Sequence, residues 1–152
     1  MTTKVTRFLI GGGLTVAALL AGGRFDLKVR NDFFAGFAGD NEALRRGMKA
    51  SEEALAANPK HAEALVWHGA GLFFEAGRFF QERDMETSRD YWTGGLKEMD
   101  DAIAMEPDSV GVLAPRGSAL LTASRFIRAE MSKPLIERGV ADYQQMFRPP
   151  DL

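Results

Sequence analysis

The chain has 152 residues, of which 45% are hydrophobic and 26% are charged, and its formal net charge is −2. This length and composition predict one globular domain and exclude a disordered chain. The net charge provides no basic field for a nucleic-acid partner, and the absence of cysteine excludes disulfides, thiolate zinc sites and thiol nucleophiles.

Residues 1–23 have the layout of a secretory signal peptide. Two basic residues precede an uncharged apolar run over residues 8–21, and small residues at positions 21–23 offer a cleavage site before Arg24. Even with Gly22 and Gly23 counted, the run has about 16 residues, which is shorter than the roughly 20 that a membrane-spanning helix needs. We therefore expect a cleaved signal and a periplasmic or secreted protein, with a membrane anchor over residues 8–23, or a buried helix, as the alternatives.

The rest of the chain, residues 24–152, shows helical apolar spacing and no strand-like alternation. Phe25, Val29, Phe33 and Phe37, for example, follow each other at intervals of four. We expect six helices: residues 25–38, 41–57, one from about His61 through Phe80, one from residue 87 or 88 to 105, one that follows a cap at Asp108 or Ser109, and 133–147. Asn58-Pro59, Glu106-Pro107 and Pro149-Pro150 mark breaks, because proline cannot continue the helix that it follows.

An internal duplication is the strongest signal in the sequence. A shift of 48 places Glu42–Pro59 on Asp90–Pro107 without a gap, and ten of the eighteen positions are identical or similar. The identical pairs are Gly47/Gly95, Lys49/Lys97, Ala54/Ala102, Ala56/Ala104 and Pro59/Pro107. The same shift then aligns Leu65/Leu113, Gly69/Gly117 and Leu72/Leu120.

These motifs resemble the tetratricopeptide repeat. Gly95-x3-Met99-x2-Ala102-x4-Pro107 is similar to the second helix of that repeat, as is Gly47-x3-Ser51-x2-Ala54-x4-Pro59, and the leucine and glycine pairs resemble its first helix. The resemblance implies an all-α fold of antiparallel helical hairpins stacked as a short tetratricopeptide-like solenoid over residues 24–152. The period differs, since the usual repeat has 34 residues.

The additional 14 residues fall inside a hairpin, around Arg78–Ser88. They include the charged stretch Gln81–Glu86, for which two interpretations stay open: a solvated loop, or an elaboration that takes part in binding.

The resemblance also implies a concave peptide-binding groove along the first helices of successive hairpins. The family's groove positions fall on Glu63, Val66, Ala70, Phe73 and Phe74 in one hairpin, and on Gly111, Ala114, Ser118, Leu121 and Thr122 in the next. Such a groove suits an apolar helix or an extended apolar peptide. In the alternative interpretation, the helix that carries Phe33, Phe34 and Phe37 already fills it.

Few residues suggest chemistry. His61 and His68 are seven apart and lack the spacing of a zinc pair, so we expect a capping His61, a packed His68 and no metal or cofactor. No serine lies near a histidine in a recognisable catalytic pattern. The carboxylate pairs Glu52-Glu53 and Asp100-Asp101 are expected on solvated helix faces.

The sequence therefore favours an exported scaffold or adaptor, not an enzyme, that binds a protein or peptide partner. A second hypothesis is an accessory subunit of an envelope transporter or enzyme complex that binds a small apolar ligand. A third, a hydrolase, is weaker, because no nucleophile, base and orienting group can be assembled.

Overall fold

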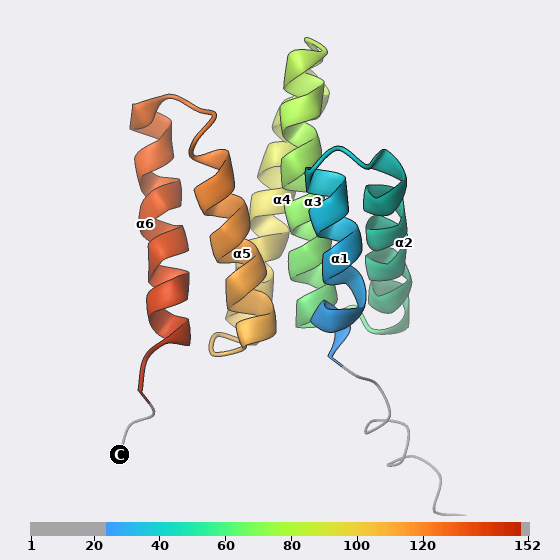
Figure 1. The fold of residues 1–152 in the computed structure, drawn as a ribbon, viewed down its shortest axis with the longest axis vertical. Helices are drawn as coiled ribbons and strands as arrows, with labels where there is room; N and C mark the ends of the chain where they lie inside the picture. Colours follow the sequence, from blue (N-terminus) through green and yellow to red (C-terminus); the bar gives the residue numbers. More distant parts are fainter. Residues whose placement is uncertain (1–23, 150–152) are drawn as a thin grey trace, which may run out of the picture.

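The computed structural model describes residues 24–149, and within that range the chain is all-helical with no strand (Figure 1). The helices are α1 (Phe25–Phe37), α2 (Asn41–Ala57), α3 (Ala62–Gln81), α4 (Met85–Met105), α5 (Val110–Ala123) and α6 (Ala129–Met146). This confirms the predicted all-α class. The predicted signal peptide or anchor lies outside the described residues. None of the helices in residues 24–149 is long and apolar enough to cross a membrane.

Local capping interactions explain the boundaries of the first helices. α1 ends at Phe37 and is followed by Gly39, whose φ of +114° suits glycine, and the amide of Asp40 donates to the carbonyl of Ala35 at 3.0 Å. The Asp40 side chain then caps α2 by accepting from the backbone N–H groups of Glu42 and Ala43. His61 caps α3 through Nδ1, which accepts from the amide of Ala64 at 3.3 Å, so the predicted capping role of His61 is confirmed.

The region expected as a long insertion is helical. α3 continues to Gln81 and α4 begins at Met85, so three residues connect them and the α3/α4 hairpin extends beyond its neighbours (Figure 1). Asp84 is the N-cap and accepts from the amide of Thr87 at 3.1 Å. The predicted start at residue 87 or 88 was wrong because this aspartate is a cap. The additional residues therefore lengthen two helices instead of forming a long loop, and the charged stretch Gln81–Glu86 is exposed around the short turn between them.

Two helices contain a proline at their sixth residue, Pro115 in α5 and Pro134 in α6. Proline lacks the amide that would bond to the residue four positions earlier, so each helix loses one backbone hydrogen bond and still continues. The sequence placed the start of α6 near Pro134, because proline is favoured in the first turn. The helix begins at Ala129 instead.

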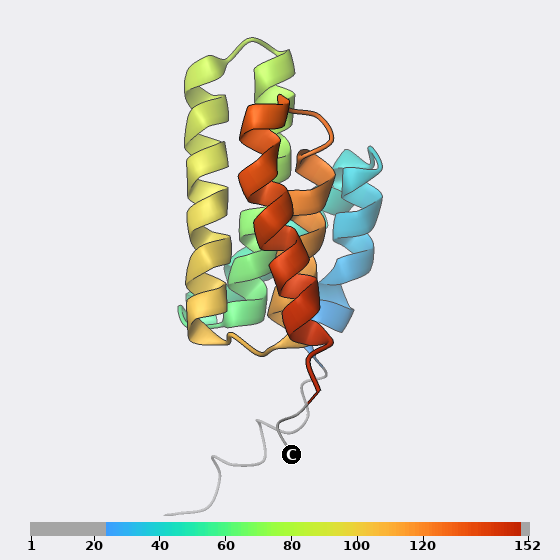
Figure 2. The same ribbon diagram turned by 90° about the vertical axis from the view of Figure 1, so that its left-hand side faces the viewer.

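α3 is the central helix of the fold. It packs against α1, α2, α4 and α5, while α6 packs mainly against α5 (Figures 1 and 2). Each pair that is consecutive in the chain, α1/α2, α3/α4 and α5/α6, is in contact and antiparallel. The core contains fully buried side chains from most of these helices: Val29, Phe33, Val66, Met99, Val112 and Leu120.

Glycines allow two of these pairs to approach closely. A Cβ on Gly95 of α4 would lie 2.6 Å from the carbonyl oxygen of Gly69 in α3. A Cβ on Gly139 of α6 would lie 3.1 Å from the carbonyl oxygen of Gly117 in α5. The α3/α4 and α5/α6 hairpins therefore each cross at a facing pair of glycines, where larger side chains would separate the backbones.

Candidate functional site

The predicted groove residues of α3 are mostly inaccessible. Val66, Ala70 and Phe73 are buried, and the ring of Phe73 packs against Trp92 of α4 with centroids 4.2 Å apart. Glu63 is half-buried and accepts the backbone N–H of Asp26 at 2.8 Å, which holds the first turn of α1. Phe74 is the exposed member of this group.

The predicted groove residues of α5 are also partly covered. Gly111 is buried, and a Cβ there would collide with the carboxylate of Glu63. Ala114, Ser118 and Leu121 are half-buried, and Leu121 lies against α6, with its Cγ 2.8 Å from the Cβ that Gly139 lacks. Thr122 is exposed. The ten positions therefore do not line one open surface in this structure, because four of them are buried.

An aromatic surface lies beside these positions and includes one of them. We define the aromatic patch as Phe34 and Phe37 of α1 and Phe74 of α3. Phe37 and Phe74 contact each other with ring centroids 4.9 Å apart, and Phe34 packs edge-on against Trp67 of α3 at 5.7 Å. Phe34 is 53% exposed and Phe74 is 38% exposed. Trp67 itself is buried, and its Nε1 has no hydrogen-bond partner.

α1, the helix that carries Phe33, Phe34 and Phe37, packs alongside α3. Phe33 is fully buried and stacks on Trp67 at 5.0 Å, while Phe34 and Phe37 lie toward the surface. α1 thus covers part of α3, as the alternative interpretation expected, and contributes exposed aromatic surface of its own.

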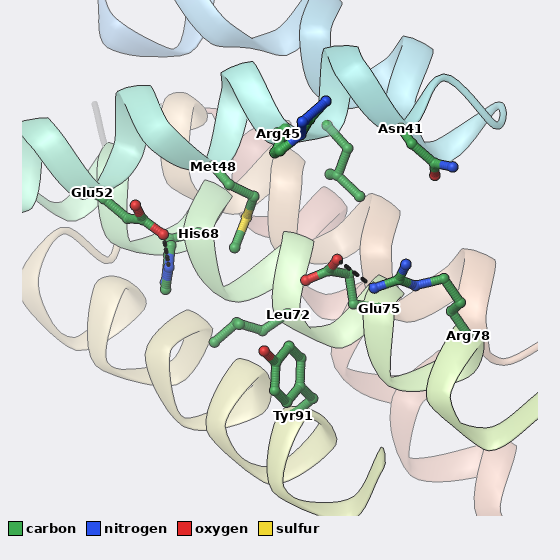
Figure 3. Close-up of a pocket in the computed structure, with 10 residues that line it drawn as sticks. Asn41, Arg45, Met48, Glu52, His68, Leu72, Glu75, Arg78 and Tyr91 are labelled. Carbon is green, nitrogen blue, oxygen red and sulfur yellow. Dashed lines mark hydrogen bonds and ion pairs between the residues drawn. The ribbon is translucent and has the colours of Figure 1, made fainter. Parts of the chain in front are cut away.

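A cleft of about 350 Å³ lies between α2, α3 and α4 (Figure 3). It is lined by Asn41, Leu44, Arg45, Met48, Glu52, His68, Leu72, Glu75, Arg78 and Tyr91. Acidic and basic side chains alternate with apolar ones along its walls, and Glu75 pairs with Arg78 at 3.1 Å. This mixed lining does not suit a purely apolar ligand.

His68 lies at one end of this cleft between two carboxylates. Its Nδ1 is 2.6 Å from Glu98 of α4, and its Nε2 is 3.7 Å from Glu52 of α2. Burial lowers the pKa of His68, but the hydrogen bond and charge of Glu98 and the charge of Glu52 outweigh it, so the pKa is raised above its ordinary value. His68 is therefore packed between helices, as expected, and it also forms ion pairs with Glu98 and Glu52 when its ring is protonated.

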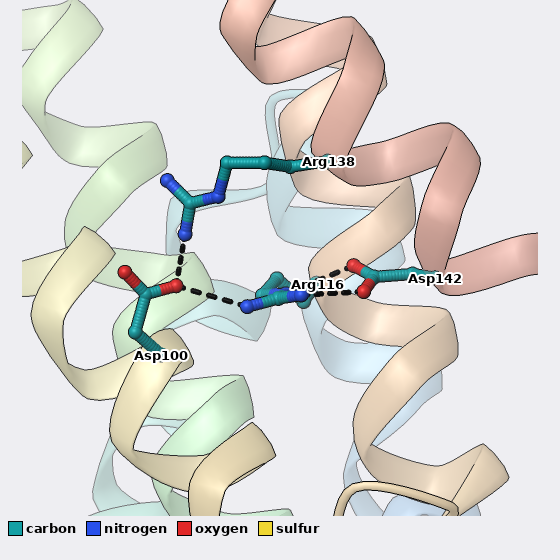
Figure 4. Close-up of polar contacts among 4 residues, drawn as sticks. All are labelled: Asp100, Arg116, Arg138 and Asp142. Carbon is teal, nitrogen blue, oxygen red and sulfur yellow. Dashed lines mark hydrogen bonds and ion pairs between the residues drawn. The ribbon is translucent and has the colours of Figure 1, made fainter. Parts of the chain in front are cut away.

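A second charged cluster joins α4, α5 and α6 (Figure 4). Arg116 of α5 binds Asp142 of α6 through two nitrogens, at 2.9 and 2.5 Å, and Asp100 of α4 at 2.9 Å. Arg138 of α6 also pairs with Asp100. Asp142 is 2% exposed, and a buried carboxylate of this kind needs a paired cation, which Arg116 provides.

The two predicted carboxylate pairs divide between solvent and these clusters. Glu53 and Asp101 form exposed pairs with lysines one turn earlier, as a solvated face predicts. Glu52 and Asp100 keep much of their side-chain exposure, and in addition each faces a cation of the following helix. The sequence held a signal for this contact, because the 48-residue shift that aligns Glu52 with Asp100 also aligns His68 with Arg116.

Comparison with protein-family models, with curated proteins and with solved structures finds no match to this chain. Within residues 24–149, no group of three histidine or carboxylate side chains is placed to hold a metal ion.

Proposed function

We propose that the chain is an exported, tetratricopeptide-like scaffold that binds an apolar helix or extended apolar peptide of a protein partner on the aromatic patch. The exposure of Phe34 and Phe74 on neighbouring helices carries this proposal. Single exposed apolar residues are ordinary, whereas a contiguous aromatic surface is typical of interaction sites. The proposal assigns the chain no catalytic role.

The helix contacts support the stacked arrangement in this proposal. α3 packs against both α1 and α5, α2 packs against α3, and α4 packs against α5. A stack in which each hairpin adds its first helix to the previous hairpin would have this order of contacts. The glycine crossings of α3/α4 and α5/α6 support it as well, because they recur at equivalent positions.

The proposed contact surface differs from the groove that the resemblance implies. Val66, Ala70 and Phe73 are buried and would need repacking before they could bind a partner. Phe34 and Phe37 lie on α1 and Phe74 lies on α3, the first helices of the first two hairpins, and these three side chains need no repacking.

Phe34→Glu and Phe74→Glu test the proposal, with Phe80→Glu as the matched control. Phe80 is on the same helix as Phe74 and is 60% exposed, but it lies near the tip of the α3/α4 hairpin. Each variant of the tagged full chain is cross-linked in an envelope extract. We expect a protein retained by the wild type and by Phe80→Glu but lost with both patch variants. Equal retention by all four proteins contradicts the patch.

A small apolar ligand on the same patch is the second candidate, favoured by the exposed rings of Phe34 and Phe74. In a Trp92→Phe variant, Trp67 is the single tryptophan, and its fluorescence would change as such a ligand binds. A flat titration with lipids and hydrophobic dyes counts against this candidate and leaves the protein partner.

The export part of the proposal rests on the sequence of residues 1–23 and is tested separately. N-terminal sequencing of the protein from an envelope fraction should begin at Arg24. A full-length N-terminus that sediments with membranes would favour the anchor over residues 8–23 instead.

A further inference from the structure

The charged groups around His68 and around Arg116 are two copies of one arrangement. Each cation directly precedes the glycine at which its hairpin crosses, Gly69 or Gly117. Each contacts a carboxylate on its hairpin partner, and this carboxylate lies three residues after the facing glycine: Glu98 after Gly95, and Asp142 after Gly139. Each also faces a carboxylate on the preceding hairpin, Glu52 or Asp100.

The two copies differ in the chemistry of the cation. Arginine stays charged at every pH at which proteins fold, and its planar group binds a carboxylate through two nitrogens, as Arg116 binds Asp142 (Figure 4). Histidine gains and loses its charge near neutral pH, and His68 occupies the equivalent place between Glu98 and Glu52. Figure 3 shows its contact with Glu52.

We propose that His68 makes the joint between α2 and the α3/α4 hairpin sensitive to pH, whereas Arg116 keeps the joint between α4 and the α5/α6 hairpin insensitive. As an imidazolium, His68 donates to Glu98 and attracts Glu52, so it links α2 to α4 across α3. Once the ring is neutral, a tautomer with Nδ1–H still donates to Glu98, but the attraction for Glu52 is lost. α2 is then held less firmly.

The other charged groups near His68 are already paired or lie further along the cleft. α2 adds Arg45, which pairs with Glu42, and α4 adds Tyr91. α3 adds Glu75 and Arg78, which pair with each other. Among residues 24–149, no ion pair connects His68 to α1 or α5. Glu52 and Glu98 are therefore the charges that respond to its proton.

The pKa of His68 determines whether the folded chain gains or loses stability as the pH rises. The pKa of His68 is raised in the folded chain above its ordinary value of 6.5. The folded state therefore binds the proton more tightly than the unfolded state does. The stabilisation is complete below pH 6.5 and is lost as the pH rises through the folded-state pKa.

Urea unfolding of the full chain in a His61→Asn background tests this proposal. The chain has two histidines, so His68 is then the single imidazole, and asparagine can still cap α3. Unfolding is compared with and without His68→Arg from about pH 5.5 to about pH 8.5. As the pH rises, the unfolding constant should increase by up to about tenfold per pH unit relative to the arginine variant. Adding Arg116→His to the arginine variant should restore the pH dependence.

Two further measurements keep the test decisive. The ring of His68, titrated by NMR, should have a pKa above 6.5. Near pH 8, the amides of α2 should exchange faster in the protein that keeps His68 than in the His68→Arg protein. The amides of α5 and α6 should exchange at equal rates in the two proteins. If His68→Arg does not fold, His68→Gln replaces it, and its deficit should appear only at low pH. Parallel pH profiles, a ring pKa at or below 6.5, or an exchange difference centred on α6 would overturn the proposal.

Discussion

Backbone conformation at single residues decides how two of the helices end. Gly39 and Arg83 both have positive φ, at +114° and +65°, and each lies two residues after the last residue of a helix. At Arg83 the amide of Asp84 reaches back to the carbonyl of Phe79 at 3.0 Å, the same pattern that Gly39 forms after α1. Arginine in this position has a Cβ that the left-handed conformation disfavours.

We predict that Arg83→Gly stabilises the protein by about 0.5 to 1 kcal/mol, because the strain is removed and the turn is unchanged. Gly39→Ala is the complementary variant and should destabilise by about 1 kcal/mol. No atom lies within 4 Å of the Cβ that it would add, so its effect is one of backbone conformation alone. Urea denaturation measures both, and stabilisation by Gly39→Ala would contradict this account.

The roles of single residues could be predicted from the sequence where they depend only on residues adjacent in the chain. His61 caps its helix as expected, since a cap needs only local geometry. Asp84 was missed as a cap because the charged stretch around it resembles a loop. The role of His68 also could not be seen locally, because its two carboxylates are on other helices.

Close approach between helices depends on which glycines face a neighbour. Gly94 and Gly95 are adjacent in α4, yet only Gly95 meets α3: a Cβ on it would lie 2.6 Å from the Gly69 carbonyl oxygen and 2.8 Å from the Phe73 nitrogen. A Cβ on Gly94 would meet nothing within 4 Å. The two positions therefore separate the helix propensity of glycine from its packing role.

We predict opposite effects of alanine at these neighbouring positions. Gly95→Ala should destabilise by about 3 kcal/mol, because the α3 backbone must move away from α4. Gly94→Ala should stabilise by about 0.8 kcal/mol, because alanine favours a helix over glycine. Thermal and urea unfolding of both variants check this. If both changes shift stability in the same direction, the close crossing is wrong.

Helix number and class could be predicted because the apolar spacing that determines them is local in sequence. The 48-residue duplication also marked the facing glycines of the repeat, Gly69, Gly95 and Gly117. The burial of Val66, Ala70 and Phe73 could not be predicted, because it depends on how α1, α4 and α5 surround α3. A groove assigned by position alone does not include those neighbours.

The whole molecule is held together by the buried core and by charged joints between successive hairpins. Asp100, Arg116 and Asp142 connect α4, α5 and α6, whereas Glu52, His68 and Glu98 connect α2, α3 and α4. Because α6 packs mainly against α5, the Arg116–Asp142 contact is central to keeping α6 in place. The buried position of Asp142 makes this contact far more sensitive than a surface ion pair.

We predict that Asp142→Asn destabilises the protein by about 3 kcal/mol, because it leaves Arg116, half-buried, without its main anionic partner. The loss of local stability should be greatest in α5 and α6. The control is Asp101→Asn, which removes an exposed pair with Lys97 and should change the stability far less. Urea unfolding gives the two magnitudes, and amide hydrogen exchange gives their location. If both variants lower the free energy of unfolding by similar small amounts, then the ion pair with Asp100 suffices to stabilise Arg116, and the apolar core alone holds α6 against α5.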